Sequence, residues 1–229
     1  MEKSQVLPTH IGFIVDGNRR WARERDLPTF EGHKRGLDHV EKIIEAVAKE
    51  KIKFASFYLF STENWNRSEE EVNYLMNLAK TKIKNLGKTA KENNMRCVFM
   101  SANNGKLDPA LQKKFDEVEE MTKDCSSGTI CFCFNYGGQQ EIADAAKKIA
   151  EESGEFTPEN LEKHLYHPEV PSCDLIVRTS GEERISGFML WRAAYSEFLF
   201  LKKYWPEIEP GDLKDILKEF ESRSRRFGK

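Results

Sequence analysis

Short apolar runs alternate along this chain with longer stretches in which apolar residues recur at helical spacing. Six of the runs have the length of strands. They cover residues 11–15, 53–60, 95–101, 129–135, 173–178 and 197–201. Helical spacing is seen at Leu37, Val40, Ile44 and Val47, at Val72, Leu75, Met76 and Ala79, and at Leu111, Phe115, Val118 and Met121. This alternation predicts an α/β fold with a mostly parallel central sheet of about six strands flanked by helices.

Two further helices have start signals. Thr157 and Pro158 suit the N-cap and first position of one helix, and Pro210 introduces a last helix before the basic C-terminal segment. No linker rich in Pro, Gly or Ser, no repeat and no low-complexity tract divides the sequence. We therefore expect residues 1–229 to form a single domain, with a ligand site at the carboxyl ends of the parallel strands.

The overall charge excludes one class of function. The 36 basic and 38 acidic residues among 229 leave a net charge of −2, so the composition argues against a general nucleic-acid binder. With 39% hydrophobic and 32% charged residues, the chain is expected to be a soluble globular protein rather than a disordered or membrane-spanning one. Any site that binds anions must therefore be local.

The start of the chain lacks the apolar core of a signal peptide, and its five cysteines form no CxxC pair. Reduced thiols in a cytosolic protein are therefore expected. Cys131 and Cys133 could be read as a metal-binding C-x-C motif. Their spacing instead places both on one face of a predicted strand, which favours buried small hydrophobic residues.

Polar residues follow three of the predicted strands. The first strand runs into residues 16–20 (DGNRR), in which a carboxylate and two guanidinium groups flank a glycine. Arg binds phosphate oxygens bidentately, and Gly lets backbone N–H groups approach an anion. The second strand runs into residues 61–67 and the fifth into residues 178–186, and both loops again combine Arg with small polar residues. We expect the three loops to form one phosphate-binding site.

Two of these loops also have a purely structural interpretation. Residues 16–20 could be a surface turn with incidental charges. Ser68 and Glu71 have the spacing of a capping box for the helix that follows them. Trp65 could contact an organic ligand, or it could simply cover the edge of the core.

Five motifs stand in order between about His10 and Gly228. They are HIGFIVDGNRRWA, FEGHKRG at 30–36, YLFSTENWNR, NYGG at 135–138, and RTSGEERISGFMLWRAAYSEFLF followed by YWPE. Together they closely resemble the cis-prenyltransferases, the undecaprenyl diphosphate synthase family. The resemblance implies Mg²⁺-dependent condensation of isopentenyl diphosphate with an allylic diphosphate to give a cis-polyprenyl diphosphate. It also implies a homodimeric α/β fold with a hydrophobic tunnel for the growing chain.

The resemblance further implies a role for each matching residue. Asp16 would be the essential carboxylate and would coordinate Mg²⁺, with Glu197 completing the metal site across the dimer. Asn64 is in the position usually assigned as proton acceptor. Because a carboxamide is a weak base, we expect Asn64 to position the substrate or water while a diphosphate oxygen accepts the proton. The implied substrate-binding residues are Gly17, Asn18, Arg19, Arg20, Trp21, His33, Ser61, Thr62, Glu63, Trp65, Arg67, Arg178, Arg184, Ile185 and Ser186.

Within this set, residues 17–20 would hold the allylic diphosphate with Trp21 and His33 beside them. Arg178, Arg184 and Ser186 would bind isopentenyl diphosphate. The C-terminal RRFG motif at 225–228 would close over the site.

Several positions depart from the family pattern. Arg19 stands where many members have Gly, and Thr29 stands where an Arg is common, so one phosphate contact is expected to have moved between these positions. Glu183 stands where members often have His. Leu59 occupies a position that is often small in long-chain members, and its bulk would narrow the tunnel. We therefore predict a product of short or medium length.

Other functions stay open at this point. A non-catalytic partner subunit of the same family would lack parts of the Asp, Asn and Arg set, and some relatives transfer the prenyl group to a non-diphosphate acceptor. A phosphohydrolase with Asp16 as nucleophile would need a second Asp where the chain has Asn18. Trans-type prenyl synthases need a DDxxD cluster, which the sequence lacks. The favoured expectation is a cytoplasmic homodimer that contacts a membrane transiently to release its apolar product.

Overall fold

The computed structural model describes residues 7–223. A six-stranded sheet in the order β3-β4-β2-β1-β5-β6 lies at its centre, and every pair of neighbouring strands is parallel. The strands are β1 (His10–Ile14), β2 (Phe54–Ser61), β3 (Met95–Met100), β4 (Gly128–Tyr136), β5 (Leu175–Arg178) and β6 (Glu197–Phe200). The predicted sheet is confirmed, and each predicted strand end lies within two residues of the observed one.

Seven α-helices connect and flank the strands in the described part of the chain. They are α1 (Asn18–Arg23), α2 (Thr29–Lys49), α3 (Glu69–Glu92), α4 (Pro109–Thr122), α5 (Gly138–Glu151), α6 (Pro158–His164) and α7 (Pro210–Ser222), with 3₁₀ turns η1 (Thr62–Asn66) and η2 (Trp205–Glu207). The predicted start of α6 is confirmed, because the Thr157 side chain accepts a hydrogen bond from the Asn160 N–H (3.1 Å). Helix α5 escaped prediction because Gly138 and Glu141 interrupt the apolar spacing of its buried face.

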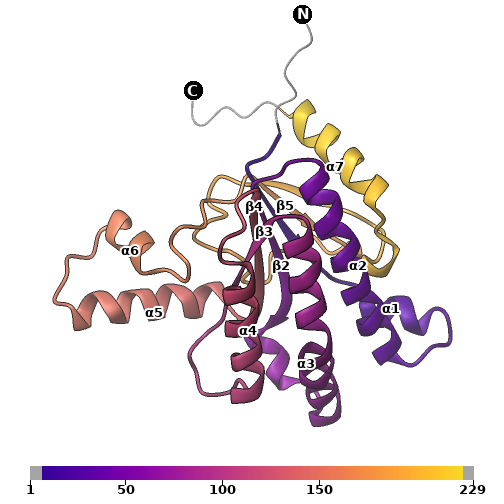
Figure 1. The fold of residues 1–229 in the computed structure, drawn as a ribbon, viewed down its shortest axis with the longest axis horizontal. Helices are drawn as coiled ribbons and strands as arrows, with labels where there is room; N and C mark the ends of the chain where they lie inside the picture. Colours follow the sequence, from indigo (N-terminus) through magenta and orange to yellow (C-terminus); the bar gives the residue numbers. More distant parts are fainter. Residues whose placement is uncertain (1–6, 224–229) are drawn as a thin grey trace, which may run out of the picture.

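Helices cover one face of the sheet, and an irregular segment covers the other. Helices α7, α2, α3 and α4 lie side by side over the first face and share one large apolar core with it (Figure 1). Residues between 166 and 193 pack on the second face. Because both faces are buried, the strands are apolar almost throughout. Cys131 and Cys133 point to the second face and are fully buried, which confirms their interpretation as core residues.

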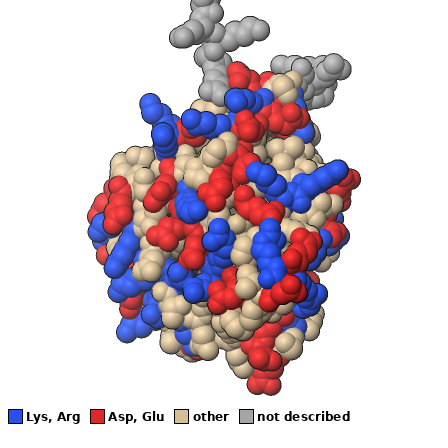
Figure 2. All heavy atoms as spheres, turned by 90° about the vertical axis from the view of Figure 1, so that its right-hand side faces the viewer, with Lys and Arg blue, Asp and Glu red and all other residues tan. Residues whose placement is uncertain are grey.

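Helices α5 and α6 project from the body of the molecule (Figure 1). A buried ion pair anchors the base of this arm, because Arg192 Nη1 donates to Glu141 Oε1 (2.6 Å) and Tyr136 donates to the other carboxylate oxygen (2.5 Å). No helix within residues 7–223 is both long and apolar enough to cross a membrane. Basic and acidic side chains are interspersed over the face seen in Figure 2, as the balanced composition predicts.

Strand β1 is central to the arrangement of the loops. It pairs with β2 on one side and β5 on the other, and Ile14 lies opposite both Tyr58 and Arg178. Since the three strands are parallel and in register, their carboxyl ends meet at one edge of the sheet. The three polar loops therefore lie beside one another.

Candidate active site

A cleft of about 500 Å³ opens at the carboxyl ends of β1, β2 and β5. It is lined by twelve of the residues predicted from the sequence. They are Asp16, Gly17, Asn18, Arg19, Arg20, His33, Ser61, Asn64, Arg67, Arg178, Arg184 and Ser186. Arg23, which sequence reasoning missed, adds a sixth guanidinium group, whereas Asp16 is the single carboxylate among the described lining residues. A nearly neutral protein thus concentrates positive charge in one cleft, which favours a ligand with several negative charges.

Asp16 lies between two guanidinium groups. Its Oδ2 atom accepts a hydrogen bond from Arg178 Nη2 (2.8 Å) and lies 3.5 Å from Arg20 Nη2, while Oδ1 accepts the Gly17 N–H (2.7 Å). Burial alone would raise the pKa of Asp16, but Arg178, the Gly17 N–H and Arg20 together hold it below its ordinary value. The carboxylate is therefore ionised at neutral pH. Its backbone is tied to the β5 loop, because the Thr179 hydroxyl donates to Asp16 O (2.6 Å).

Gly17 is required by the turn that follows β1. Its φ of 99° lies in the left-handed region, and an added Cβ would come within 2.5 Å of the Tyr204 ring. Any other residue would strain this turn or displace Tyr204. Because α1 begins at Asn18, the turn also determines the direction in which Arg19 and Arg20 project.

Glu71 holds together a second group of cationic side chains. Its carboxylate pairs with Arg67 (2.8 Å) and Arg19 (3.3 Å) and lies 3.4 Å from His33 Nε2. The predicted capping box is formed only in part. The Ser68 hydroxyl accepts the Glu71 N–H (3.4 Å), but the Glu71 side chain turns to Arg67 and Arg19, which line the cleft. The capping interpretation concealed this role, although the i, i+4 spacing from Arg67 signalled an ion pair.

His33 is neutral at physiological pH. Burial, together with the neighbouring Arg67, lowers the pKa of His33 to about 4, and the nearby Glu71 carboxylate offsets this only in part. The ring thus lines the cleft without adding a positive charge.

Asn64 lines the cleft, and the oxygen of its side-chain amide is already engaged. Its carbonyl oxygen accepts the Ser61 N–H (3.0 Å), as part of the cap that begins η1. A backbone N–H can donate only to the oxygen, so this contact determines the orientation of the amide. The side chain is therefore placed as a hydrogen-bond donor.

Five of the implied substrate-binding residues do not line the cleft. Arg25 and Arg35 stack on the Trp21 ring, with guanidinium carbons 4.8 and 5.5 Å from its centre. Trp65 packs against Phe60 and donates to Asn135 Oδ1 (2.7 Å), so the structure favours the interpretation that Trp65 covers the core edge. Of the remaining residues, Thr62 donates to Glu63 (3.0 Å) outside the cleft, and Ile185 packs against the apolar cluster on the second face of the sheet.

Glu197 lies at the amino ends of the strands, whereas Asp16 lies at their carboxyl ends. It begins β6 opposite Leu175, the first residue of β5, whereas Asp16 follows the last residue of β1. In this chain its carboxylate lies 3.4 Å from Arg223 Nη1. A metal site that uses both carboxylates would therefore need two copies of the chain. The RRFG motif lies outside the described residues.

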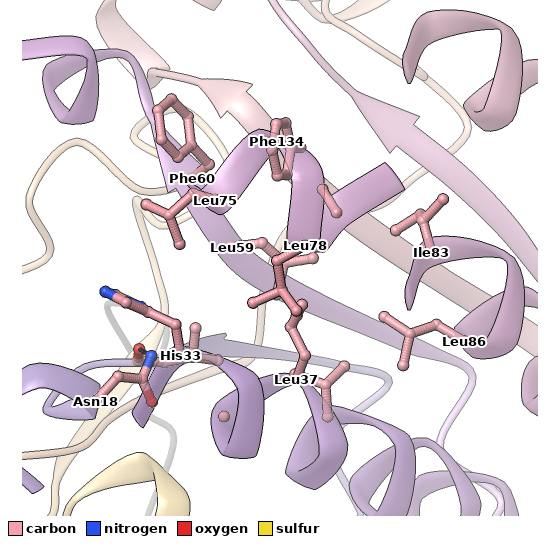
Figure 3. A pocket seen from close by; sticks show the side chains of 14 residues that line it. Asn18, His33, Leu37, Leu59, Phe60, Leu75, Leu78, Ile83, Leu86 and Phe134 are labelled. Carbon is pink, nitrogen blue, oxygen red and sulfur yellow. Dashed lines mark hydrogen bonds between the residues drawn. The ribbon is translucent and has the colours of Figure 1, made fainter. Parts of the chain in front are cut away.

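A narrow apolar cavity continues from the cleft. It runs between α2, α3 and the sheet, and it shares Val15, Asn18, His33, Leu59 and Leu75 with the cleft. In Figure 3, Asn18 and His33 lie at one end of this cavity, and Ile83 and Leu86 lie at the other. Its volume is about 40 Å³, against about 500 Å³ for the cleft, so it has room for only a few water molecules. A hydrocarbon chain would have to move the lining side chains apart.

Comparisons with known proteins show which family the chain resembles. The protein family described as "Putative undecaprenyl diphosphate synthase" matches residues 14–228. The chain is 40% identical to an isoprenyl transferase of Thermotoga maritima, with 97% of each protein covered. It is 41% identical to a decaprenyl diphosphate synthase of Mycobacterium tuberculosis, over 97% of this chain and 77% of that protein.

Solved structures show the same fold. A lavandulyl diphosphate synthase from Lavandula x intermedia, solved in complex with dimethylallyl diphosphate, superposes with a TM-score of 0.93 at 29% identity, covering 99% of this chain and 100% of the other. A probable undecaprenyl diphosphate synthase from Campylobacter jejuni gives a TM-score of 0.83 at 30% identity with the same coverage. The chain therefore belongs to the undecaprenyl diphosphate synthase family and is a prenyltransferase.

Proposed function

We propose that the chain condenses isopentenyl diphosphate with an allylic diphosphate, in a Mg²⁺-dependent reaction, to make a cis-polyprenyl diphosphate of short or medium length. The observation that carries this proposal is the direct continuity between a cleft with six Arg side chains and an apolar cavity. A prenyl diphosphate has the same two-part character, with an anionic head and a hydrocarbon tail. The dimethylallyl diphosphate bound to the lavandulyl diphosphate synthase further supports an allylic substrate.

Two diphosphates have to share the cleft. We assign the turn at Gly17–Arg20 and His33 to the allylic diphosphate, and Arg178, Arg184 and Ser186 to isopentenyl diphosphate. The second group is already assembled, because Arg178 Nη1 donates to Ser186 Oγ (2.8 Å) and to the Arg184 carbonyl (2.5 Å). When the allylic C–O bond breaks, negative charge grows on the departing diphosphate, and the guanidinium groups are placed to stabilise it.

The donor set at Asp16 fits Mg²⁺. Magnesium is commonly held by one or two carboxylates together with substrate phosphate oxygens, and Asp16 is an ionised carboxylate beside the arginines of the cleft. Bound Mg²⁺ would supply further positive charge to the leaving diphosphate. Glu197 could contribute only from a second copy, which is one reason to propose a homodimer.

The donor orientation of Asn64 supports a positioning role. In the proposed step, the terminal carbon of isopentenyl diphosphate forms a bond to the allylic carbon, and a proton then leaves the isopentenyl unit. Because the Asn64 oxygen is engaged by Ser61 N–H, its NH₂ group would hold a diphosphate oxygen or a water. A diphosphate oxygen would accept the proton.

Arg19 and Thr29 support the expected exchange of a phosphate contact. Arg19 lines the cleft, where its pairing with Glu71 orients it, whereas Thr29 begins α2 and does not line the cleft. We therefore propose that Arg19 supplies the contact that Thr29 lacks.

The length of the apolar cavity, which we take as the tunnel for the growing chain, suggests the length of the product. Its wall on α3 extends from Leu75 to Leu86, which is about 16 Å at the helical rise of ~1.5 Å per residue. Each isoprene unit adds four bonds to a prenyl chain. At the reach per bond of an extended polypeptide backbone, these four bonds span about 4.6 Å. Between three and four units would fill this length, in agreement with a short or medium product. Leu59 narrows the tunnel where it joins the cleft.

The alternatives are less well supported. A non-catalytic partner subunit would not need Asp16, Asn64, Arg178 and Arg184 in one cleft, as they are here. Prenyl transfer to a non-diphosphate acceptor would leave the Arg178 and Arg184 group without a ligand. We also propose that the enzyme is cytoplasmic, in keeping with its five free cysteines, and that the apolar product leaves through brief contact with a membrane.

One assay tests the proposal. Purified protein is incubated with labelled isopentenyl diphosphate and, separately, dimethylallyl, geranyl or farnesyl diphosphate, with Mg²⁺ or with a chelator, and products are separated by length. We expect Mg²⁺-dependent incorporation that Asp16→Ala abolishes. No incorporation with any starter would refute the proposal, and equal incorporation with the chelator would refute the role of Mg²⁺.

A further inference from the structure

Ser180 has a backbone conformation that is unfavourable for its residue type. Its φ of 77° lies in the left-handed region, which a non-glycine residue adopts only at an energetic cost. Two backbone hydrogen bonds impose this turn, since Ser180 N–H donates to Lys203 O (2.7 Å) and Gly181 N–H donates to Leu201 O (2.8 Å). Strain of this kind persists where the surrounding structure enforces it, and it is concentrated at functional sites.

The Ser180 side chain contacts a residue of the cleft. Its hydroxyl oxygen accepts a hydrogen bond from Arg20 Nη2 (2.5 Å) and thereby joins the loop after β5 to helix α1. The Arg20 guanidinium is also held by Glu182 (2.8 Å) through Nη1 and lies 5.8 Å from the centre of the Tyr204 ring. Glu182 offsets the positive charge of Arg20, whereas a hydroxyl orients it and leaves its charge intact.

We infer that Ser180 is a positioning residue, whose hydroxyl holds Arg20 in the orientation that binds the allylic diphosphate. The inference rests on the proposed function of the cleft. It explains why a strained serine occupies a buried position at which glycine would relieve the strain. It also predicts opposite effects of one substitution on stability and on binding, which a purely structural serine would not produce.

Two substitutions separate the effect of the hydroxyl from the effect of the backbone strain. Ser180→Gly removes the hydroxyl and relieves the strain, whereas Ser180→Ala removes the hydroxyl and keeps the strain. Ser153 provides a matched control, because it also has a left-handed φ (53°) but is exposed after α5 and does not line the cleft. The measurements are the thermal midpoint, KM and kcat with geranyl diphosphate, and the affinity for inorganic diphosphate by titration calorimetry.

We expect both Ser180 variants to bind inorganic diphosphate about tenfold more weakly and to show a similar rise in KM, with a smaller change in kcat. Ser180→Gly should unfold at or above the wild-type temperature, and Ser180→Ala below it. Ser153→Gly should bind as the wild type does. Unchanged binding by Ser180→Gly, or parallel losses of stability and binding in that variant, would overturn the inference alone. Wild-type protein that binds no diphosphate would overturn the proposed function as well.

Discussion

Replacing Leu59 by Ala should lengthen the product. The side chain borders both the cleft and the apolar cavity, whose volume is only about 40 Å³, so removal of three carbon atoms widens the tunnel where the chain enters it. We expect the product distribution to move upward by one or more isoprene units. The substitution also has a cost in stability, because Leu59 packs against the core. Full burial would make that cost ~2–5 kcal/mol, and for this half-buried side chain we expect about 1–2 kcal/mol.

The assay resolves labelled products by length under a fixed ratio of substrates, and thermal unfolding is followed in parallel. The melting temperature of a protein of this size should fall by roughly 2–4 °C per kcal/mol. Leu107→Ala is a matched control, since Leu107 is also a half-buried leucine on the same core but does not line the tunnel. It should lower the melting temperature without changing product length. A folded Leu59→Ala variant with the wild-type distribution would refute the tunnel argument.

Three further predictions concern the site and the core. Asn64→Asp should lose as much kcat as Asn64→Ala, because Asp keeps the oxygen that caps η1 but lacks the NH₂ donor. An aspartate variant with high activity would show that the oxygen, and not the NH₂ group, acts in the reaction. Gly17→Ala should lower both stability, by about 1–3 kcal/mol, and activity. Gly211→Ala, with no heavy atom within 4 Å of the added Cβ, should lower neither. Burial lowers the pKa of His10 and of His33 to about 4, so the unfolded chain binds more protons and stability is lost as the pH falls from about 6.5 towards 4. Near pH 5 the loss should be roughly 2 kcal/mol for each histidine, and equal urea midpoints at pH 7.5 and 5 would contradict it.

The fold was predictable because its signals are local. The apolar run at residues 129–135 is short and rich in aromatic and β-branched residues, which predicts a strand from its own sequence, and parallel pairing follows from the helices between the runs. The meeting of the three loops was predictable for the same reason, since parallel strands bring their carboxyl ends to one edge. The orientation of single side chains was not predictable. Trp65, in η1, turns towards the core because its ring N–H donates to Asn135 on β4, a contact that depends on the assembled sheet.

Glu197 shows what the direction of a strand adds to a motif. The site was expected at the carboxyl ends of parallel strands. Glu197 begins the sixth predicted strand, so the same reasoning already placed it at the amino ends. The structure agrees with the position in the strand. A motif therefore indicates that residues act together, whereas strand direction decides whether one chain can bring them together.

The distribution of charge around the cleft explains how a nearly neutral chain could bind the two diphosphates that we propose as its substrates. Asp16 and Glu182 each pair with two of the arginines, Arg20 being common to both, and Glu71 pairs with Arg19 and Arg67. Three carboxylates thus orient five arginines, and an excess of positive charge remains for the ligand. Each carboxylate pairs with at least one Arg from another part of the chain, so this arrangement exists only in the folded protein. The net charge of −2 could exclude an extended basic surface, but it had no bearing on a cleft of this kind.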